Sequence, residues 1–284
     1  MTDWLVSTQW LAAHLADPDI VILDCSWYLP ETGKHAIDDF RRGHIPGARF
    51  IDLGVVSDPD SPYVNMLPNA ERWAGEVGRL GIGNDTMVVV YDAGYVSARL
   101  WWMFRTFGHD SARILDGGWR KWKAEGRAIE TGDGAAVEPV RFDANLREGR
   151  IAQTADVLEA LASGSATVVD ARTAARFDGT EGSGYPGVAS GHMPGAINTP
   201  WARFFDAERN YVFVGEDAAM RVFAEAGADI AGPVVTTCGS GVTAAILGFM
   251  IERSGNHDWK LYDGSWHEWA QRSDTPKQTK AKDS

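Results

Sequence analysis

The chain has 284 residues, and its 44% hydrophobic and 23% charged content is typical of a globular protein of about two domains. Its net charge of -12 argues against nonspecific nucleic-acid binding, so we expect no nucleic-acid partner. There is no apolar run of about eighteen residues and no basic segment followed by an apolar stretch. We therefore expect no membrane span, no signal peptide and a cytoplasmic location.

Cysteine and histidine usage excludes several kinds of site. The two cysteines, Cys25 and Cys238, are too few for a disulfide framework or a four-thiolate zinc site. The histidines show no spacing typical of zinc ligands. We predict neither a metal nor a cofactor.

The sequence contains two copies of one pattern, offset by 146 to 148 residues. The segment from Ser7 to Asp24 matches the segment that ends at Asp170, and Gly-His-Ile-Pro-Gly-Ala at 43–48 recurs as Gly-His-Met-Pro-Gly-Ala at 191–196. A repeat of this length indicates a duplicated domain rather than a solenoid. We predict a first domain with its linker at 1–138, and a second at 139–284 that ends in a flexible tail from Ser273.

Each copy predicts the same order of helices and strands. A helix capped by Ser7 or Thr154 begins each copy, and a buried strand follows at 20–24 or 167–170. After the Gly-His turn, a helix that carries Trp73 or Met220 and Phe223 ends near a glycine. A buried strand at 88–92 or 234–237, a loop, a helix and a last short strand complete the copy. This alternation predicts an α/β fold with a mainly parallel sheet and helices on both faces.

The loop at Cys238 is the strongest candidate site. It joins a buried strand to a helix whose apolar residues, from Val242 to Met250, are spaced as one helical face. Backbone N–H groups at such a turn favour an anionic thiolate. An inert buried cysteine is the alternative. The first copy has Asp92 at this position, so we predict that only the second copy is catalytic and that Cys25 has a packing role.

Taken together, these features resemble two-domain rhodaneses from about Trp4 to Trp269. The loop at 238–243, Cys-Gly-Ser-Gly-Val-Thr, is similar to that of the 3-mercaptopyruvate sulfurtransferases. The resemblance implies two tandem rhodanese-like domains and a double displacement, in which the Cys238 thiolate takes sulfur from the small-molecule donor 3-mercaptopyruvate as a persulfide and pyruvate leaves. A thiol, such as a thioredoxin-like protein, or cyanide then removes the sulfur. Catalysis is expected from Cys238 and Ser240, with substrate-binding donors at Gly239, Gly241, Val242 and Thr243.

The donor's carboxylate calls for an arginine, which binds carboxylates with two parallel hydrogen bonds. The resemblance assigns this role to Arg176. Arg172 is a second candidate, with a structural ion pair as an equally weighted alternative. Gly54 and Asn65 stand where the mercaptopyruvate group has a proposed aspartate and histidine relay, and Tyr185 stands where it has a second arginine.

Other functions remain as alternatives. A thiosulfate sulfurtransferase typically has basic residues where Gly239 and Ser240 stand. A phosphatase of this scaffold needs an arginine where Ala244 lies, so that activity is disfavoured. A non-enzymatic sulfur carrier or scaffold with a decayed relay is the third reading. His44 and His192 recur in both copies, including the one without a thiol, and are predicted to serve the turn.

Overall fold

The computed structural model describes residues 4–29, 32–134 and 137–280. The chain forms two compact units. The first unit comprises Met1–Pro59, Leu67–Arg147 and Asp206–Phe213, and the second comprises Asp60–Met66, Glu148–Phe205 and Val214–Ser284. The division therefore falls after Arg147 rather than after residue 138. Each unit also includes one short segment from the other copy, an exchange that the repeat pattern did not reveal.

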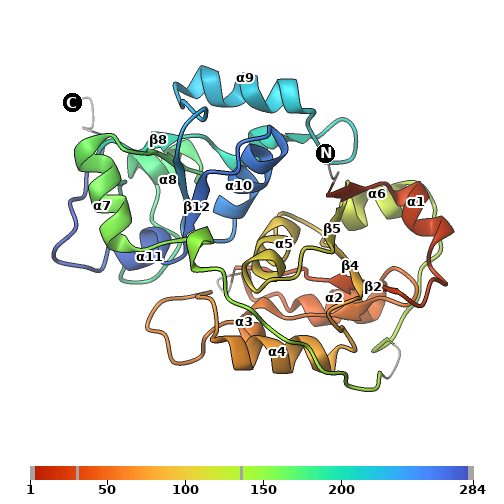
Figure 1. Ribbon diagram of the computed structural model, residues 1–284. Coiled ribbons are helices and arrows are strands. Elements are labelled where there is room, and N and C mark those ends of the chain that lie inside the picture. Colours follow the sequence, from red (N-terminus) through yellow and green to blue (C-terminus); the bar gives the residue numbers. More distant parts are fainter. Residues whose placement is uncertain (1–3, 30–31, 135–136, 281–284) are drawn as a thin grey trace. The chain divides into compact units, whose positions relative to one another are not determined.

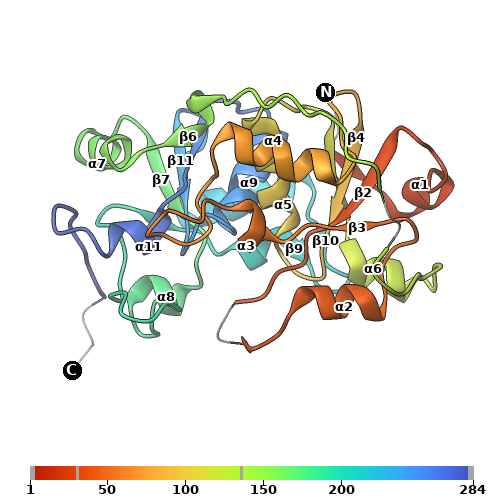
Figure 2. The same cartoon turned by 90° about the horizontal axis from the view of Figure 1, so that it is seen from below.

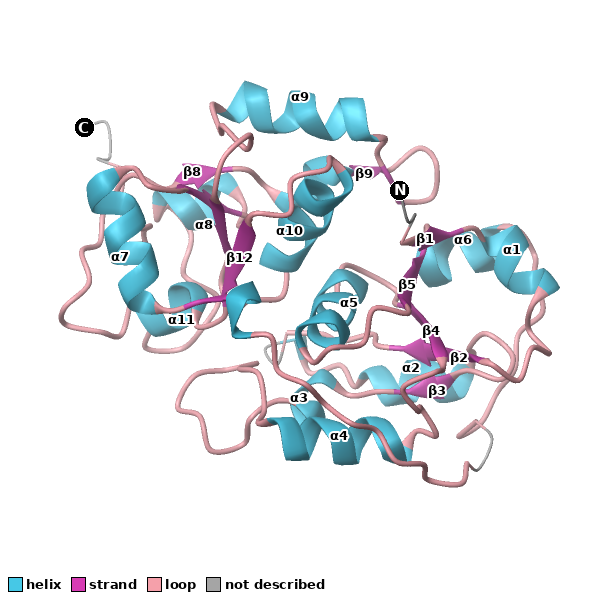
Figure 3. Cartoon of the chain, viewed as in Figure 1, coloured by secondary structure: helices cyan, strands magenta, loops and turns pink. Residues whose placement is uncertain are grey.

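The first unit is built on a parallel sheet with strand order β1-β5-β4-β2-β3 (Figures 1 and 3). Its elements are β1 (Leu5–Val6), α1 (Thr8–Ala13), β2 (Ile20–Asp24), α2 (Ala36–Arg42), β3 (Arg49–Phe50), α3 (Leu53–Val56), α4 (Ala70–Arg79), β4 (Met87–Tyr91), α5 (Ser97–Thr106), β5 (Ala112–Leu115), α6 (Gly118–Ala124) and β10 (Val212–Phe213).

The second unit repeats this order as β6-β12-β11-β7-β8, again parallel. Its elements are η2 (Glu148–Arg150), β6 (Ile151–Ala152), α7 (Thr154–Ser163), β7 (Thr167–Asp170), α8 (Ala174–Asp178), β8 (Ile197–Asn198), η3 (Trp201–Phe204), α9 (Glu216–Ala226), β11 (Val234–Thr237), α10 (Ala244–Arg253), β12 (Trp259–Tyr262) and α11 (Ser265–Trp269). Strand β9 (Phe205–Asp206) pairs with β10 at the exchanged segment.

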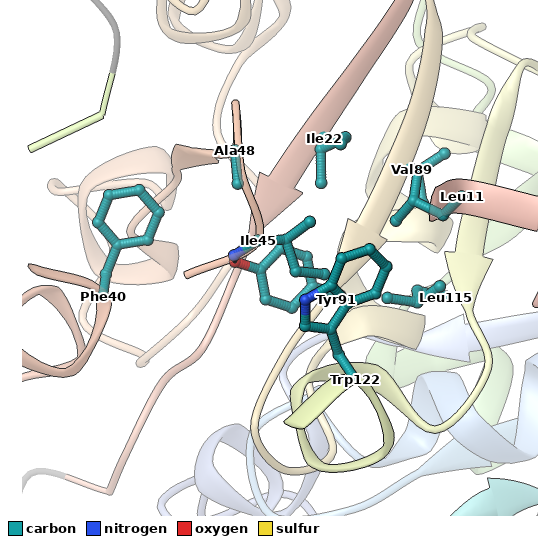
Figure 4. Packing of buried hydrophobic residues seen from close by; sticks show 9 residues of the cluster. All are labelled: Leu11, Ile22, Phe40, Ile45, Ala48, Val89, Tyr91, Leu115 and Trp122. Carbon is teal, nitrogen blue, oxygen red and sulfur yellow. The ribbon is translucent and has the colours of Figure 1, made fainter. Parts of the chain in front are cut away.

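Helices cover both faces of each sheet, as predicted. In the first unit α1, α2 and α6 lie on one face and α4 and α5 on the other (Figures 1 and 2). Figure 4 shows the core on the first of these faces, where Tyr91 and Trp122 fill the space beneath the sheet. The Tyr91 hydroxyl there accepts a hydrogen bond of 3.2 Å from the Ile45 N–H, which joins the Gly-His turn to the middle of the sheet.

In the second unit α7, α8 and α11 cover one face, and α9 and α10 cover the other (Figure 1). The core under the first of these faces is Ala152, Val157, Ala160, Val168, Met193, Val235, Tyr262, Trp266 and Trp269. Within the described part of the chain, no helix has both the length and the apolar character to cross a membrane.

Two helices are buried differently from a simple amphipathic pattern. Helix α10 is buried along its whole length from Ala244 to Glu252, and not on one face only, because it packs against β11, β12, η3 and α9. Met220 is 43% exposed, whereas Ala219 and Phe223 of the same helix are buried. The buried stripe of α9 thus runs through positions 219 and 223, and Met220 lies to its side.

Two terminal features also differ from prediction. Helix α7 is capped by Gln153 in a capping box with Asp156, and not by Thr154. The expected flexible tail is wrong for residues 273–280, because Gln278 bridges to His192 and Thr275 is buried. The remaining tail residues, 281–284, lie outside the described residues.

The aspartates that end β2 and β7, Asp24 and Asp170, have different hydrogen-bond partners in the two copies. In the second unit Asp170 is bound by the Arg172 guanidinium, with Oδ2 2.7 Å from Nη2. In the first unit Ser26 stands in place of that arginine, and its N–H donates to Asp24 Oδ1 at 2.8 Å. Burial raises the pKa of Asp24 from 3.8 to about 6, although the hydrogen bonds from Ser26 oppose the shift. Among the described residues, Asp24 is therefore a buried carboxylate without a cation to offset its desolvation.

We predict a pH-dependent cost from Asp24. An acid whose pKa is higher in the folded than in the unfolded chain destabilises the fold as pH rises from about 4 through about 6. The shift of about two pH units corresponds to about 3 kcal/mol. In urea titrations, Asp24→Asn is expected to gain stability relative to the natural chain between pH 4.5 and 7.5. Asp19→Asn, at an exposed carboxylate before the same strand, is the control. If Asp24→Asn changed the free energy of unfolding by the same amount at pH 4.5 and at pH 7.5, the account would be contradicted.

Candidate active site

The predicted nucleophile lies at the carboxyl end of the middle strand of the second sheet. Strand β11 ends at Thr237, Cys238 follows it, and α10 begins at Ala244. Cys238 is 2% exposed, and Gly241 has a φ of +76°, a conformation that favours glycine. The sequence thus predicted the strand, the loop and the helix correctly. Ligands of parallel sheets bind at this edge.

Ser265 holds the Cys238 loop in place through hydrogen bonds, a role that sequence reasoning did not predict. Its Oγ accepts hydrogen bonds from the N–H groups of Cys238 at 3.2 Å and Gly241 at 3.0 Å, and it donates to the Tyr262 carbonyl at 2.8 Å. Ser265 is fully buried with a φ of +49°, a conformation that costs a non-glycine residue about 1–3 kcal/mol. The first copy has Gly118 here, with the same φ. The replacement of glycine by serine between the two copies is the sequence signal that could have revealed this role of Ser265.

The first unit shows what this loop does to negative charge. The carboxylate of Asp92 accepts hydrogen bonds from the backbone N–H groups of Gly94, of Val96 at 2.8 Å and of Ser97 at 2.5 Å. Counted along the repeat, the corresponding amides of the second copy follow Cys238 within the predicted loop. The strand-to-helix turn is therefore an anion cradle. In the first unit its own carboxylate occupies the cradle.

Ser240 lies beside a residue from the first copy. Residues 60–66 belong to the second unit, and the Asn65 amide Nδ2 donates to Ser240 Oγ at 3.1 Å. Asn65 has a φ of +59°, a conformation in which asparagine is enriched. Gly54 lies in α3 of the first unit, where its N–H donates to Asp52 Oδ1. The asparagine therefore contacts the catalytic loop through Ser240, as a position in the expected relay would require.

Arg172 serves the fold. It is 4% exposed, and its guanidinium binds both oxygens of Asp170, with Nε at 3.1 Å from Oδ1 and Nη2 at 2.7 Å from Oδ2. It also stacks on the Trp266 ring at 4.7 Å. The charge of a buried arginine that binds a carboxylate with two hydrogen bonds is already neutralised by that partner. Of the two alternatives for Arg172, the geometry supports the structural ion pair.

Arg176 is half-buried on α8, and its guanidinium lies beneath the backbone at Gly184. A Cβ atom at Gly184 would be 2.9 Å from Arg176 Nη1, so a side chain there would have to shift the guanidinium. Gly184 also has a φ of +88°. The sequence predicted Arg176 as the carboxylate ligand but not the glycine that makes room for it.

Tyr185, the next residue, reaches the catalytic loop. A Cβ atom at Gly239 would lie 3.2 Å from Tyr185 Cε2 and 3.3 Å from its hydroxyl oxygen, which is tighter than ordinary contact. The ring thus packs on the residue that directly follows Cys238. Among the described residues, the set brought together in the second unit includes Cys238, Gly239 and Tyr185, and the Arg176 guanidinium lies against Gly184, the residue before Tyr185.

His267 also borders the loop and was missed by sequence reasoning. Its backbone N–H donates to the Gly239 carbonyl at 2.9 Å. Its ring makes T-shaped contacts with Tyr185 and Tyr63, with ring centroids 4.9 Å and 6.1 Å apart. Gln271 Nε2 lies 3.2 Å from its Nδ1. Burial lowers the pKa of His267 below 6.5, so the ring is neutral near pH 7. Arg120 takes this place in the first copy, which was the only signal for it.

The repeated histidines pack as the turn requires. In each, Nδ1 lies 2.8 Å from a carbonyl oxygen, that of Phe40 for His44 and that of Phe177 for His192. Each ring stacks on the same phenylalanine, at 3.9 Å and 4.0 Å. Cys25 is buried, with Sγ donating to the Tyr91 carbonyl at 3.2 Å, and burial raises the pKa of its thiol. These contacts fit the predicted packing roles.

Comparisons with known proteins agree with this geometry. The rhodanese-like domain family matches residues 7–125 and 153–272. The chain is 42% identical over 279 residues to the 3-mercaptopyruvate sulfurtransferase of Rattus norvegicus, covering 95% of this chain and 92% of that protein. It is 37% identical over 279 residues to the thiosulfate sulfurtransferase of the same species, with the same coverage.

A solved structure gives the same relationship. The crystal structure of SseA from Escherichia coli, described as a 3-mercaptopyruvate sulfotransferase with the rhodanese fold, has a TM-score of 0.85 and 34% sequence identity. The match covers 93% of this chain and 99% of that one. The chain therefore belongs to the rhodanese family, and within it to the two-domain 3-mercaptopyruvate sulfurtransferases.

Proposed function

We propose that this chain transfers sulfur from 3-mercaptopyruvate to a thiol or cyanide acceptor through a persulfide on Cys238, releasing pyruvate. The observation that carries the proposal is the pair of duplicated loops. One loop binds the Asp92 carboxylate through three backbone N–H groups, and the other has a thiol at the same position. A cradle that binds an anion in one copy suits an anionic sulfur in the other. The first unit, with no thiol in its loop, is then non-catalytic.

The proposed reaction has two displacements. The Cys238 thiolate attacks the donor sulfur, the S–S bond forms, and the C3–S bond breaks with its electron pair left on the enolate of pyruvate. The substrate's thiol proton stays on the outer sulfur of the new persulfide until it is released, and C3 takes a proton to give pyruvate. An acceptor thiolate then attacks the outer sulfur and frees the Cys238 thiolate. Backbone donors at 239–243 stabilise the persulfide anion, and Ser240 adds a hydroxyl.

The donor's carboxylate is assigned to Arg176. Arg172 is engaged with Asp170, whereas Arg176 is half-buried on α8 and lies against Gly184. The acceptor is a small thiol or a thioredoxin-like protein. A reducing compartment would keep the Cys238 thiol usable, and the cytoplasmic location stays a prediction.

Thiosulfate is the second candidate donor. The similarity to a thiosulfate sulfurtransferase supports it, but the loop offers glycine and serine, rather than cations, beside Cys238. The two donors are separated by measuring pyruvate release from 3-mercaptopyruvate and thiocyanate formation from thiosulfate plus cyanide. A larger kcat/KM for 3-mercaptopyruvate is expected, and the reverse order would reassign the donor. No turnover of either donor would favour a sulfur carrier or scaffold.

Cys238→Ser is expected to lower turnover of either donor by more than about a thousandfold, because a hydroxyl cannot carry the transferred sulfur. Cys25→Ala is the matched control, since Cys25 is buried in the first unit and hydrogen-bonded to Tyr91. It should keep near-normal rates. Full activity in Cys238→Ser would refute the assignment.

Asn65→His is expected to raise kcat for 3-mercaptopyruvate by about tenfold, because an imidazole beside Ser240 can exchange a proton near neutral pH and an amide cannot. The φ of +59° at Asn65 is one that histidine tolerates. Asn210→His, at the same φ in the first unit, is the control and should leave kcat unchanged. An unchanged rate in Asn65→His would mean that the proton takes another route.

A further inference from the structure

Tyr185 is held in place by a dedicated turn. The buried Ser183 accepts a hydrogen bond from the Tyr185 N–H at 3.2 Å, and its Oγ lies 3.0 Å from the carbonyl oxygens of both Tyr185 and Val188. Gly184 between them adopts a left-handed conformation. A serine that binds both ends of a short turn fixes the direction in which the intervening side chain leaves the backbone.

The Tyr185 side chain extends toward Gly239, the residue that directly follows Cys238. The phenol end of Tyr185 is the part that contacts Gly239, as the 3.3 Å approach of its hydroxyl oxygen to a Cβ position there shows. The His267 ring also packs against the Tyr185 ring in a T-shaped contact at 4.9 Å. A side chain at position 239 would therefore require the Tyr185 ring to shift.

Arg176, Tyr185 and Cys238 follow one another in the same order as the functional groups of a 2-oxo thiol acid. The Arg176 guanidinium lies under Gly184, the Tyr185 phenol lies over Gly239, and Cys238 adjoins Gly239. In 3-mercaptopyruvate a carboxylate, a keto oxygen and a sulfur follow one another in the same order. A cation, a neutral O–H donor and a nucleophile are the groups that would recognise them.

We propose that Tyr185 is a catalytic residue, whose phenol O–H binds the keto oxygen of 3-mercaptopyruvate while Arg176 binds its carboxylate. This inference rests on the proposed function and names the substrate contacts of the same site.

The phenol acts mainly in the transition state. When the C3–S bond breaks, its electron pair moves onto the enolate, and the keto oxygen gains negative charge. A donor aimed at that oxygen is therefore stronger in the transition state than in the bound substrate, and its loss lowers kcat more than it raises KM. Arg176 binds a carboxylate whose charge does not change in the reaction. Its loss should therefore act mainly on KM.

Thiosulfate separates this role from general damage to the site. In its reaction an S–S bond breaks and sulfite leaves, so no enolate forms and no keto oxygen needs a donor. A residue that acts on the keto oxygen must affect 3-mercaptopyruvate much more than thiosulfate.

The test compares Tyr185→Phe, Arg176→Gln and the control Tyr211→Phe with the natural chain. Tyr185→Phe keeps the ring on Gly239 and removes only the hydroxyl. Tyr211, which stacks on Arg120 at 4.2 Å in the first unit, loses a hydroxyl outside the site. Pyruvate release gives kcat and KM for 3-mercaptopyruvate, thiocyanate formation gives them for thiosulfate, and circular dichroism checks the fold.

Tyr185→Phe should lower kcat for 3-mercaptopyruvate by about a hundredfold, with a loss at least about ten times larger than for thiosulfate. Arg176→Gln should raise KM by at least about tenfold, and Tyr211→Phe should match the natural chain. Equal losses for both donors in Tyr185→Phe, or a change in KM only, would overturn the role of Tyr185. No pyruvate from the natural chain would instead refute the proposed function.

Discussion

Negative charge held by backbone N–H groups, where the middle strand of a parallel sheet turns into a helix, is the interaction on which this protein depends. The first unit displays it directly, because the Asp92 carboxylate takes three amides of its own loop. Backbone donors of this kind are fixed by the strand and the helix and need no reorganisation when charge appears. The second unit applies the same loop to the Cys238 thiol. Ser265 holds the loop in shape by accepting hydrogen bonds from two of its amides, and it does so in a left-handed backbone conformation that is unfavourable for serine.

Duplication let the two copies diverge around this shared loop. The copy with Asp92 also lacks the arginine that neutralises its strand-end aspartate, so Asp24 remains buried with a raised pKa. The copies also exchange segments. Residues 60–66 belong to the second unit and bring Tyr63 to His267, whereas residues 206–213 belong to the first and bring Tyr211 to Arg120. The second unit, proposed to be the catalytic one, thus includes residues from the first copy of the repeat.

Much of the fold could be predicted from local pattern. The strands at 20–24 and 167–170 have the predicted bounds, since short buried runs of β-branched residues are unambiguous when a repeat confirms them. The repeat could also reveal the nucleophile, because the two loops can be compared. Properties set by tertiary packing could not be predicted. The exchange of segments leaves no periodic signal, and α10 looks amphipathic although other elements surround it. The ion pair of Arg172 and the contact of Tyr185 with Gly239 depend on distances that no spacing in the sequence encodes.

The position of the transferred sulfur tests the central claim most directly. After one equivalent of 3-mercaptopyruvate without acceptor, peptide mapping by mass spectrometry should find a gain of about 32 Da, one sulfur atom, on the peptide that contains Cys238. The peptide with Cys25 should be unchanged, and an added thiol should remove the gain. Pyruvate release with no sulfur on Cys238, or with sulfur on Cys25, would contradict the account.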